Sequence, residues 1–460
     1  VNVMHERIDH GANLLKNNVF QFDFLNDDFS KLPQSLQDII NDEEKRKKLV
    51  VYINPPYAEA TSSKTVTGTG ENKGGVTTQF KINELLKPKI GNASNEIFAL
   101  FMANIYEKIP SCILCQFSKM KFVNGSNFKK FKDYFLADYV SGFIVPGDTF
   151  DNVKGKFPIG FTIWNTSIKS KISTIATDIY DKKGNFNSTK NFYGELPNNI
   201  NKWIKLFDEK VENGISFMGN PSPDFQHNSQ LYLSINKGIE HFNFFNFTKN
   251  NLITGSIYFS IRNCIEAIWI NDRDQYLFPN EGWQTDNEFQ NDCLAFTLFH
   301  GQNRITTSEG TNHWIPFTEY EVNAQAKFES NFMTDFIKGK IKQEVTTTDL
   351  FNSETSPNRV SNPVRALDEN IELQFSEEAT AVFDAGRELW KYYHAQKDVN
   401  VNASLYDIRE YFQGRNDKGR MNSKSDDATY TQLLAELRNK LAVLADKIKP
   451  KVYEYGFLKE

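Results

Sequence analysis

A short apolar run that ends in two prolines constrains the fold of this chain more than any other feature. Residues 49–53 (LVVYI) lead directly into Asn54-Pro55-Pro56-Tyr57. A β-branched and aromatic run of this kind predicts a buried strand. Each proline lacks an N–H and fixes φ at about −65°, and it also keeps the preceding residue out of helical space. We therefore expect a strand that stops abruptly and holds Asn54 and Pro55 extended at its carboxyl end.

The chemistry of this turn indicates what it could hold. In open α/β sheets, ligands bind beyond the carboxyl ends of the strands. The side-chain carbonyl of Asn54 and the backbone carbonyl of Pro55 would be two aimed acceptors, with the Tyr57 ring beside them. This combination suits an amino group on a planar heterocycle. An ordinary surface turn is the alternative, since Asn-Pro is a common turn dipeptide, but the apolar strand before it favours a binding site.

The chain around this turn alternates between strands and helices. A short strand is expected around Val19–Phe24, and residues 95–109 predict an amphipathic helix with apolar side chains at i, i+4 spacing. A further helix-like segment covers 127–136. Three more strands are predicted: 111–117, 138–146 and 158–165. This alternation implies a largely parallel sheet, and the last two strands are compatible with one antiparallel strand at its edge.

The alternation of strand-like and helix-like segments ends after residue 170. Residues 171–345 contain short mixed runs, many Asn residues and several aromatics without the earlier alternation, and residues 346–375 are polar and contain prolines, as linkers do. The last part, 376–460, predicts two amphipathic helices, 376–396 and 429–448, that pack on the body of the protein or on a partner helix.

Composition excludes several classes of protein. A chain of 460 residues with 39% hydrophobic and 24% charged residues is typical of a globular protein with two or three domains. No apolar stretch approaches the ~18 residues of a membrane span, and the charged N-terminus does not resemble a signal peptide. Four cysteines favour a reducing, cytoplasmic setting, with Cys112 and Cys115 expected as core thiols because residues three apart on a strand face opposite sides. We find no His-based metal cluster and expect no metal.

Charge is unevenly distributed along the chain. The net charge of −5 argues against a protein that coats nucleic acid indiscriminately. Residues 111–171 nevertheless contain nine Lys against four Asp, which fits either a solvated helix face or an electrostatic footprint for phosphates. The basic stretch 414–424 is likewise either a solvated loop or a phosphate contact. The candidate phosphate ligands in the first segment are Lys119, Lys121, Lys129 and Lys130.

Strand, Asn-Pro-Pro-Tyr, helix and strand in this order resemble the S-adenosylmethionine-dependent N6-adenine DNA methyltransferases, over residues 17–170. Residues 95–101 resemble the cofactor-side helix of that family, and residues 115–136 resemble its next strand, loop and helix. The stretch 147–150 (GDTF) resembles the element that supplies an aromatic wall for the target base. Methyltransferase motifs followed by a variable region resemble the modification parts of type I and fused type II restriction systems.

The resemblance implies a fold, a cofactor and partners. The implied fold class is α/β, with a partial Rossmann-like methyltransferase sheet in residues 1–170. A mixed α+β target-recognition domain would follow in 171–345, and C-terminal helices would follow the linker 346–375. The implied cofactor is S-adenosyl-L-methionine. The implied partners are double-stranded DNA and restriction or specificity subunits or domains, in the cytoplasm.

The resemblance also implies roles for the residues of the opening turn. Asn54 and Pro55 would bind the N6 amino group of adenine, and Pro56 would complete the catalytic tetrapeptide. Tyr57 would stack on a base flipped out of the duplex, and Phe150 would close the other face of that base.

The cofactor side departs from the family pattern. Asp23 with Phe24 would lie by the cofactor adenine, and Phe101 would pack against the cofactor. The Gly-rich turn of the family normally precedes Asn-Pro-Pro-Tyr, but residues 1–53 contain one glycine, Gly11, which is not in such a turn. No candidate turn lies downstream. We therefore expect an N-terminally truncated piece of a longer polypeptide that binds the cofactor weakly or not at all by itself.

Several functions remain open from the residues alone. Two carbonyl acceptors for an amino group also suit N4-cytosine methylation. Methylation of protein glutamine or of amino groups in RNA can use the same tetrapeptide. A non-catalytic fragment that binds DNA or a partner subunit is the alternative from another class. The sequence upstream of the first codon would discriminate between an enzyme and a binding fragment.

Overall fold

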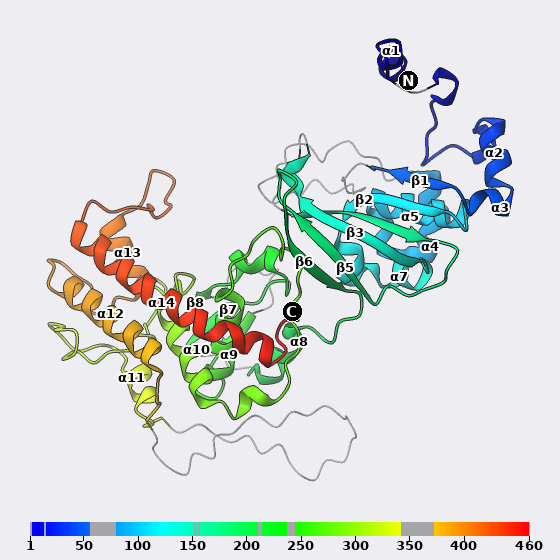
Figure 1. Ribbon diagram of the computed structural model, residues 1–460. Helices are drawn as coiled ribbons and strands as arrows, with labels where there is room; N and C mark the ends of the chain where they lie inside the picture. The colour runs from blue at the N-terminus through cyan, green and yellow to red at the C-terminus, as the bar shows by residue number, and fades with distance from the viewer. Residues whose placement is uncertain are drawn as a thin grey trace, which may run out of the picture. The chain divides into compact units, whose positions relative to one another are not determined.

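A computed structural model describes most of the chain in two compact units (Figure 1). Unit 1 comprises residues 1–196 and 268–273, and unit 2 comprises residues 197–267 and 274–460. The described residues are 2–12, 15–55, 80–150, 153, 157–209, 214–236, 244–341 and 372–459. Pro56, Tyr57 and most of the predicted linker therefore lie outside the described residues.

Unit 1 is built on a six-stranded mixed sheet in the order β1-β2-β4-β3-β5-β6. Its strands are β1 (Val50–Ile53), β2 (Ile113–Lys119), β3 (Asp138–Pro146), β4 (Pro158–Asn165), β5 (Thr174–Tyr180) and β6 (Phe186–Tyr193). The pairs β1–β2 and β3–β5 are parallel, whereas β4 is antiparallel to both β2 and β3, and β6 is antiparallel to β5. The predicted α/β class is confirmed.

Four of the predicted strands are confirmed in position, and four expectations about the sheet are wrong. The sheet is not largely parallel, because three of its five strand pairs are antiparallel. The strand β1, expected to be buried, lies at the edge of the sheet, where Val50 and Tyr52 are exposed. The antiparallel strand β4 lies inside the sheet rather than at its edge, because its side chains are apolar on both faces and both of its neighbours can pair with it. The segment around Val19–Phe24 forms no strand. Its aromatic side chains pack as rings instead: Phe22 contacts Phe29 at 5.7 Å between centroids.

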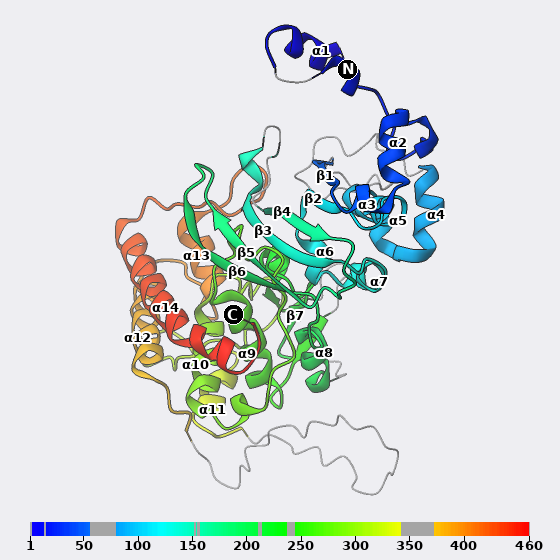
Figure 2. The same ribbon diagram turned by 45° about the vertical axis from the view of Figure 1, so that its right-hand side comes forward.

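Helices cover one face of this sheet. Figures 1 and 2 both show α4 (Lys81–Ile90), α5 (Ile97–Lys108) and α7 (Lys129–Tyr134) on the same side of the strands. The predicted helices over 95–109 and 127–136 are thereby confirmed. The remaining helices of unit 1 are α1 (Asn2–Asp9), α2 (Gln34–Ile40), α3 (Glu43–Arg46) and α6 (Lys121–Asn124), with 3₁₀ turns η1 (Lys16–Asn18), η2 (Phe29–Lys31), η3 (Gly91–Asn95), η4 (Ser126–Phe128) and η5 (Gly147–Thr149).

The other face of the sheet carries a row of aromatic side chains, one from each strand. Neighbouring rings in this row have centroids 4.8 to 6.3 Å apart. In strand order the rings are Tyr52, Phe117, Phe161, Phe143, Tyr180 and Phe186. The two terminal members are 63% and 57% exposed, so the row reaches solvent at both ends.

Unit 2 combines a small sheet with a helical core. Its strands β7 (Ser216–Gly219), β8 (Leu233–Ser234) and β9 (Phe244–Phe247) are antiparallel, in the order β8-β7-β9. The helices are α8 (Ile200–Ile204), α9 (Leu252–Asn263), α10 (Asn287–Phe299), α11 (Phe332–Ile337), α12 (Glu377–His394), α13 (Leu405–Gln413) and α14 (Ala428–Glu454), with 3₁₀ turns η6 (Lys205–Phe207), η7 (Phe225–Gln230) and η8 (Gly282–Gln284). The two predicted C-terminal helices are confirmed as α12 and α14, and they share one hydrophobic core with α9 and α10.

The compact units and the ranges predicted as domains have different boundaries. Residues 274–460 belong to one unit across the predicted boundaries at 345 and 375, and residues 268–273 belong to unit 1. The predicted boundary at residue 170 falls inside unit 1, because β5 and β6 lie after it and extend the sheet from β3. The assignment of residues 171–345 to target recognition stays a prediction.

Candidate functional site

Asn54 and Pro55, the described part of the predicted turn, follow the carboxyl end of β1. Ile53 is the last residue of this strand and pairs with Gln116 of β2, so Asn54 and Phe117 are the next residues along these two parallel strands. Asn54 is exposed and Pro55 is buried. The strand stops where the two prolines predict, and the amide that follows it is accessible to a ligand.

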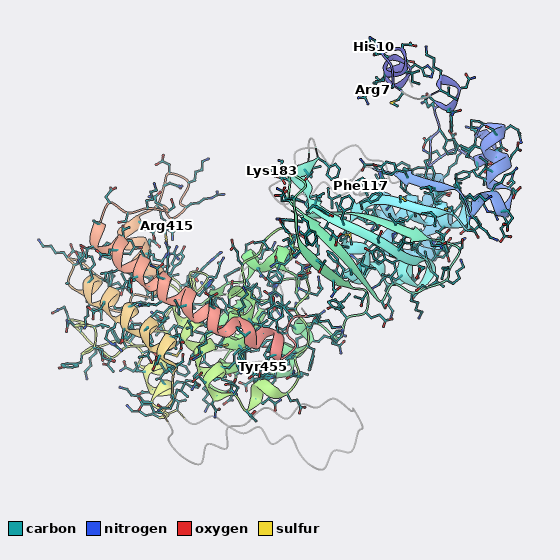
Figure 3. The ribbon with its side chains drawn as sticks, viewed as in Figure 1. Arg7, His10, Phe117, Lys183, Arg415 and Tyr455 are labelled. Carbon is teal, nitrogen blue, oxygen red and sulfur yellow. The ribbon has the colours of Figure 1, made fainter. Side chains whose placement is uncertain are left out.

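An aromatic pair lies beside this turn. The ring of Phe150 contacts the ring of Phe117 with centroids 5.4 Å apart and planes at 76°. Phe150 follows η5, the 3₁₀ turn after β3, and its backbone N–H donates to the carbonyl of Gly147 at 3.2 Å. Figure 3 labels Phe117 in the sheet. Phe150, the residue predicted to close one face of the target base, thus contacts Phe117 of β2, the strand that pairs with β1.

Phe117 was not among the predicted site residues. Side chains alternate between the two faces of a strand, and Leu114, Gln116 and Ser118 of β2 are fully buried. Phe117 therefore lies on the opposite, half-open face with Tyr52. Its alternation was visible in the sequence, but the neighbouring position of Asn54 depends on the pairing of β1 with β2.

Buried polar atoms line the helix-covered side of the same region. The Oε1 of Gln116 and the hydroxyls of Ser94 and Ser118 have no hydrogen-bond partner within the described ranges. The amide nitrogen of Gln116 donates to the carbonyl of Phe98 in α5 at 3.5 Å. An unpaired buried polar atom costs about 1–3 kcal/mol, so a polar group from water or a ligand would stabilise this end of β2.

Two of the four candidate phosphate ligands already have a carboxylate partner. Lys121 contacts Oε1 of Glu96, the residue before α5, and the Nζ of Lys119 lies 3.9 Å from Oε2. The side chains of these lysines are only 16% and 15% exposed. Lys129 and Lys130 on α7, in contrast, are exposed. A phosphate contact by the first two lysines would require exchange of the Glu96 ion pair.

The residues predicted on the cofactor side come together. The rings of Phe24 and Phe101 stack with centroids 4.6 Å apart and planes at 11°. The carboxylate of Asp23 accepts from the backbone N–H of Leu25 at 3.1 Å and from the side chain of Asn26 at 2.8 Å. Asp23 is therefore held in a local turn, and it directly precedes Phe24, one member of a ring pair formed by residues far apart in sequence.

Thiol and metal chemistry is not indicated at this site. Cys112 and Cys115 are buried and free, as predicted for core thiols, and burial raises the pKa of each thiol. Among the described residues, no group of three or more His, Cys, Asp or Glu side chains could hold a metal ion. No helix in the described part of the chain is long and apolar enough to cross a membrane.

These features define a mixed α/β sheet in which Asn54 and Pro55 follow the carboxyl end of β1. No protein-family model matches the chain, and no curated protein matches it either. Solved structures do show similarity. One is a modification subunit of a putative type I restriction enzyme from Vibrio vulnificus YJ016, at 14% identity and a TM-score of 0.20, over 30% of this chain and 28% of that chain.

A second similar structure is the ATP-dependent type ISP restriction-modification enzyme LlaBIII bound to DNA. It matches at 14% identity and a TM-score of 0.24, over 40% of this chain and 16% of that chain. The matched part is thus less than a third of either protein's own length. Similarity at these TM-scores carries no argument about family or function.

Proposed function

We propose that this chain is part of an S-adenosylmethionine-dependent DNA methyltransferase that modifies the N6 amino group of adenine within a restriction-modification system. The observation that carries the proposal is the placement of Asn54 and Pro55 at the carboxyl end of β1, beside the Phe117–Phe150 ring pair. Two carbonyl acceptors and a pair of rings match an aromatic amine in both hydrogen bonding and shape.

The proposed chemistry needs polarisation more than acid–base catalysis. An aromatic amine is a weak nucleophile because its lone pair is delocalised into the ring. When both N–H bonds donate to Asn54 Oδ1 and the Pro55 carbonyl, the nitrogen moves toward tetrahedral geometry and its lone pair becomes available. The bound cofactor supplies an electrophilic methyl group. Because a base inside a duplex is out of reach, it must be extruded and held between rings, a role for Phe150 and, outside the described residues, Tyr57.

The residues of unit 1 fit the adenine end of this cofactor. Phe24 and Phe101 offer parallel, partly exposed ring surfaces, with Asp23 at their edge. A planar ring can stack on the outer surface of this pair. Insertion between the two rings would require their separation by roughly one further contact distance, ~3.5 Å.

The test is Asn54→Ala, with Asn187→Ala as the matched control because Asn187 is an exposed amide on β6. Methyl transfer is measured with tritiated cofactor, on the chain alone and on the polypeptide read from its gene's own start codon. Loss of one polarising group in a preorganised site typically lowers the rate ~10²–10³-fold. DNA affinity should stay within about threefold, since phosphate contacts dominate it. Near-wild-type turnover in Asn54→Ala would overturn the proposal.

A further inference from the structure

Arg409 on α13 carries a partly buried guanidinium without a carboxylate partner. Its Nη1 donates to the backbone carbonyl of Gly301 at 3.3 Å. Its Nε is buried and has no hydrogen-bond partner in the part of the chain that the structure describes. Burial and the positive charges of Arg438 and Arg304 lower the pKa of this guanidinium. The side chain remains a cation at neutral pH, with only a neutral oxygen in contact.

Arg304 and Arg438, whose charges act on Arg409, also form no ion pair with an acidic side chain of the described residues. Arg304 donates to Oε1 of Gln302 at 3.0 and 2.7 Å, and its guanidinium lies 4.8 Å from the centre of the Tyr232 ring. Arg438 is exposed on α14 and forms no ion pair with the described residues. We call Arg304, Arg409 and Arg438 the arginine cluster. It joins the segment after α10 with α13 and α14.

The acidic side chains of α13, Asp407 and Glu410, bind groups other than the arginine cluster. Asp407 accepts from the Thr306 hydroxyl at 2.6 Å and from the Thr307 N–H at 3.1 Å. Glu410 forms a bidentate pair with Arg415, at 2.6 and 2.7 Å. Neither carboxylate therefore neutralises the arginine cluster.

The remaining groups that face Arg409 add no compensating charge. Tyr406 and Tyr430 interact with Arg409 and raise the pKa of its guanidinium, while burial raises the pKa of the Tyr430 phenol to about 12. Burial and the Arg409 charge lower the pKa of His300 to about 4, so this ring is neutral at neutral pH. The charges of Arg304 and Arg438 thus act on Arg409, and no carboxylate among the described residues forms an ion pair with it.

We propose that the arginine cluster binds a phosphate group, and that this phosphate belongs to a polynucleotide backbone. Guanidinium groups present planar pairs of N–H donors that match phosphate oxygens bidentately. A bound phosphate would relieve the repulsion between the three cations and satisfy the buried Nε of Arg409. Nothing in this proposal depends on methyl transfer, because phosphate binding is measured separately.

The surface next to the cluster favours a polynucleotide over a free phosphate. Arg415 reaches the Tyr406 hydroxyl at 3.5 Å and begins the exposed segment that joins α13 to α14, where Figure 3 labels it. This segment, 414–424, contains four basic residues and one acidic residue. Because Glu410 already pairs with Arg415, the other basic residues of this segment, Lys418, Arg420 and Lys424, are the ones that suit further phosphates of a strand.

The test uses Arg304→Gln and Arg438→Gln, singly and together, because both side chains are exposed and their loss should not prevent folding. The control is Arg387→Gln on α12, whose guanidinium is paired with Asp384 and lies 3.6 Å from Glu321. Binding of a fluorescently labelled duplex is measured by anisotropy over a series of salt concentrations. Melting temperature is measured with inorganic phosphate and with chloride at equal ionic strength.

We expect the double variant to bind DNA about tenfold more weakly, with a log–log salt slope reduced by ~0.9 for each lost phosphate contact. The control should keep the wild-type slope. If phosphate stabilises the wild-type chain but not the double variant while the DNA slope is unchanged, the site holds and its ligand is a free phosphate, which overturns the polynucleotide assignment. If neither measurement changes, or if only an acidic peptide competes for the cluster, the phosphate site itself is overturned.

Discussion

The turn at the end of β1 in unit 1 and the arginine cluster of unit 2 present opposite chemistry to a ligand. Under the proposed function, the turn would offer the carbonyl oxygens of Asn54 and Pro55 near the Phe117–Phe150 ring pair and accept hydrogen bonds from a flat, neutral group. The cluster offers N–H donors and positive charge. In DNA recognition, phosphate contacts position the protein and contacts to bases carry the specificity. The first site should therefore control the reaction and the second the affinity.

A second contrast lies within the basic side chains. Lys119 and Lys121 belong to a lysine-rich segment of the sequence, yet they share the carboxylate of Glu96. The residues of the arginine cluster are spread over more than one hundred positions in the sequence. None of them forms an ion pair with a carboxylate of the described residues. The number of basic residues in a segment does not decide whether their charge is available to a ligand. That depends on whether the folded chain pairs them with carboxylates.

The largest expected effect tests whether the two sites act on separate steps. Asn54→Ala combined with Arg304→Gln and Arg438→Gln should lower methylation at subsaturating DNA by the product of the separate losses, ~10³–10⁴-fold, since free energies of independent contributions add. The measurement is initial rate against DNA concentration. At saturating DNA, only the loss due to Asn54→Ala should remain. A loss at saturation that still depends on the two arginines would contradict the division of roles.

An intermediate effect is expected for Phe150→Ala. A base stacked on an aromatic ring gains ~1–3 kcal/mol, which corresponds to about 5- to 150-fold weaker capture of the flipped base. Fluorescence of 2-aminopurine at the target position reports this capture directly. The control is Phe186→Ala, which removes an exposed ring at the far end of the same aromatic row. Equal losses in both variants would indicate that the whole row, rather than the ring at the turn, holds the base.

The smallest effect on DNA is expected for Lys121→Gln. Since Lys121 is largely buried against Glu96, its removal should change DNA affinity by less than about twofold and leave the salt slope unchanged. It should instead lower the melting temperature, because the carboxylate of Glu96 stays buried with the more distant Lys119. Lys130→Gln on the exposed face of α7 is the comparison. A salt slope reduced by about one in Lys121→Gln would contradict this assignment and restore the phosphate contact.

Local sequence signals were sufficient for several elements. The stop of β1 at Ile53 follows from the two prolines, and the bounds of β3 and β4 agree with the apolar runs 138–146 and 158–165. Helix α5 was predicted from its apolar period. The strand predicted at Val19–Phe24 does not form, and the reason is physical. Aromatic residues favour strands only where a neighbouring strand is available, and here Phe22 and Phe24 pack against other aromatic rings instead.

The sequence by itself determined part of the local conformation of this protein: where β1 stops, and which runs form α5, β3 and β4. These outcomes depend on backbone sterics and on side-chain periodicity, which act over a few residues. Only the tertiary structure decided that β4 inserts between β2 and β3, that Phe150 meets Phe117, and that Phe24 stacks on Phe101. It also decided which basic side chains are neutralised. Contacts between rings and between charges depend on distances between segments far apart in the chain, and no local pattern encodes those distances.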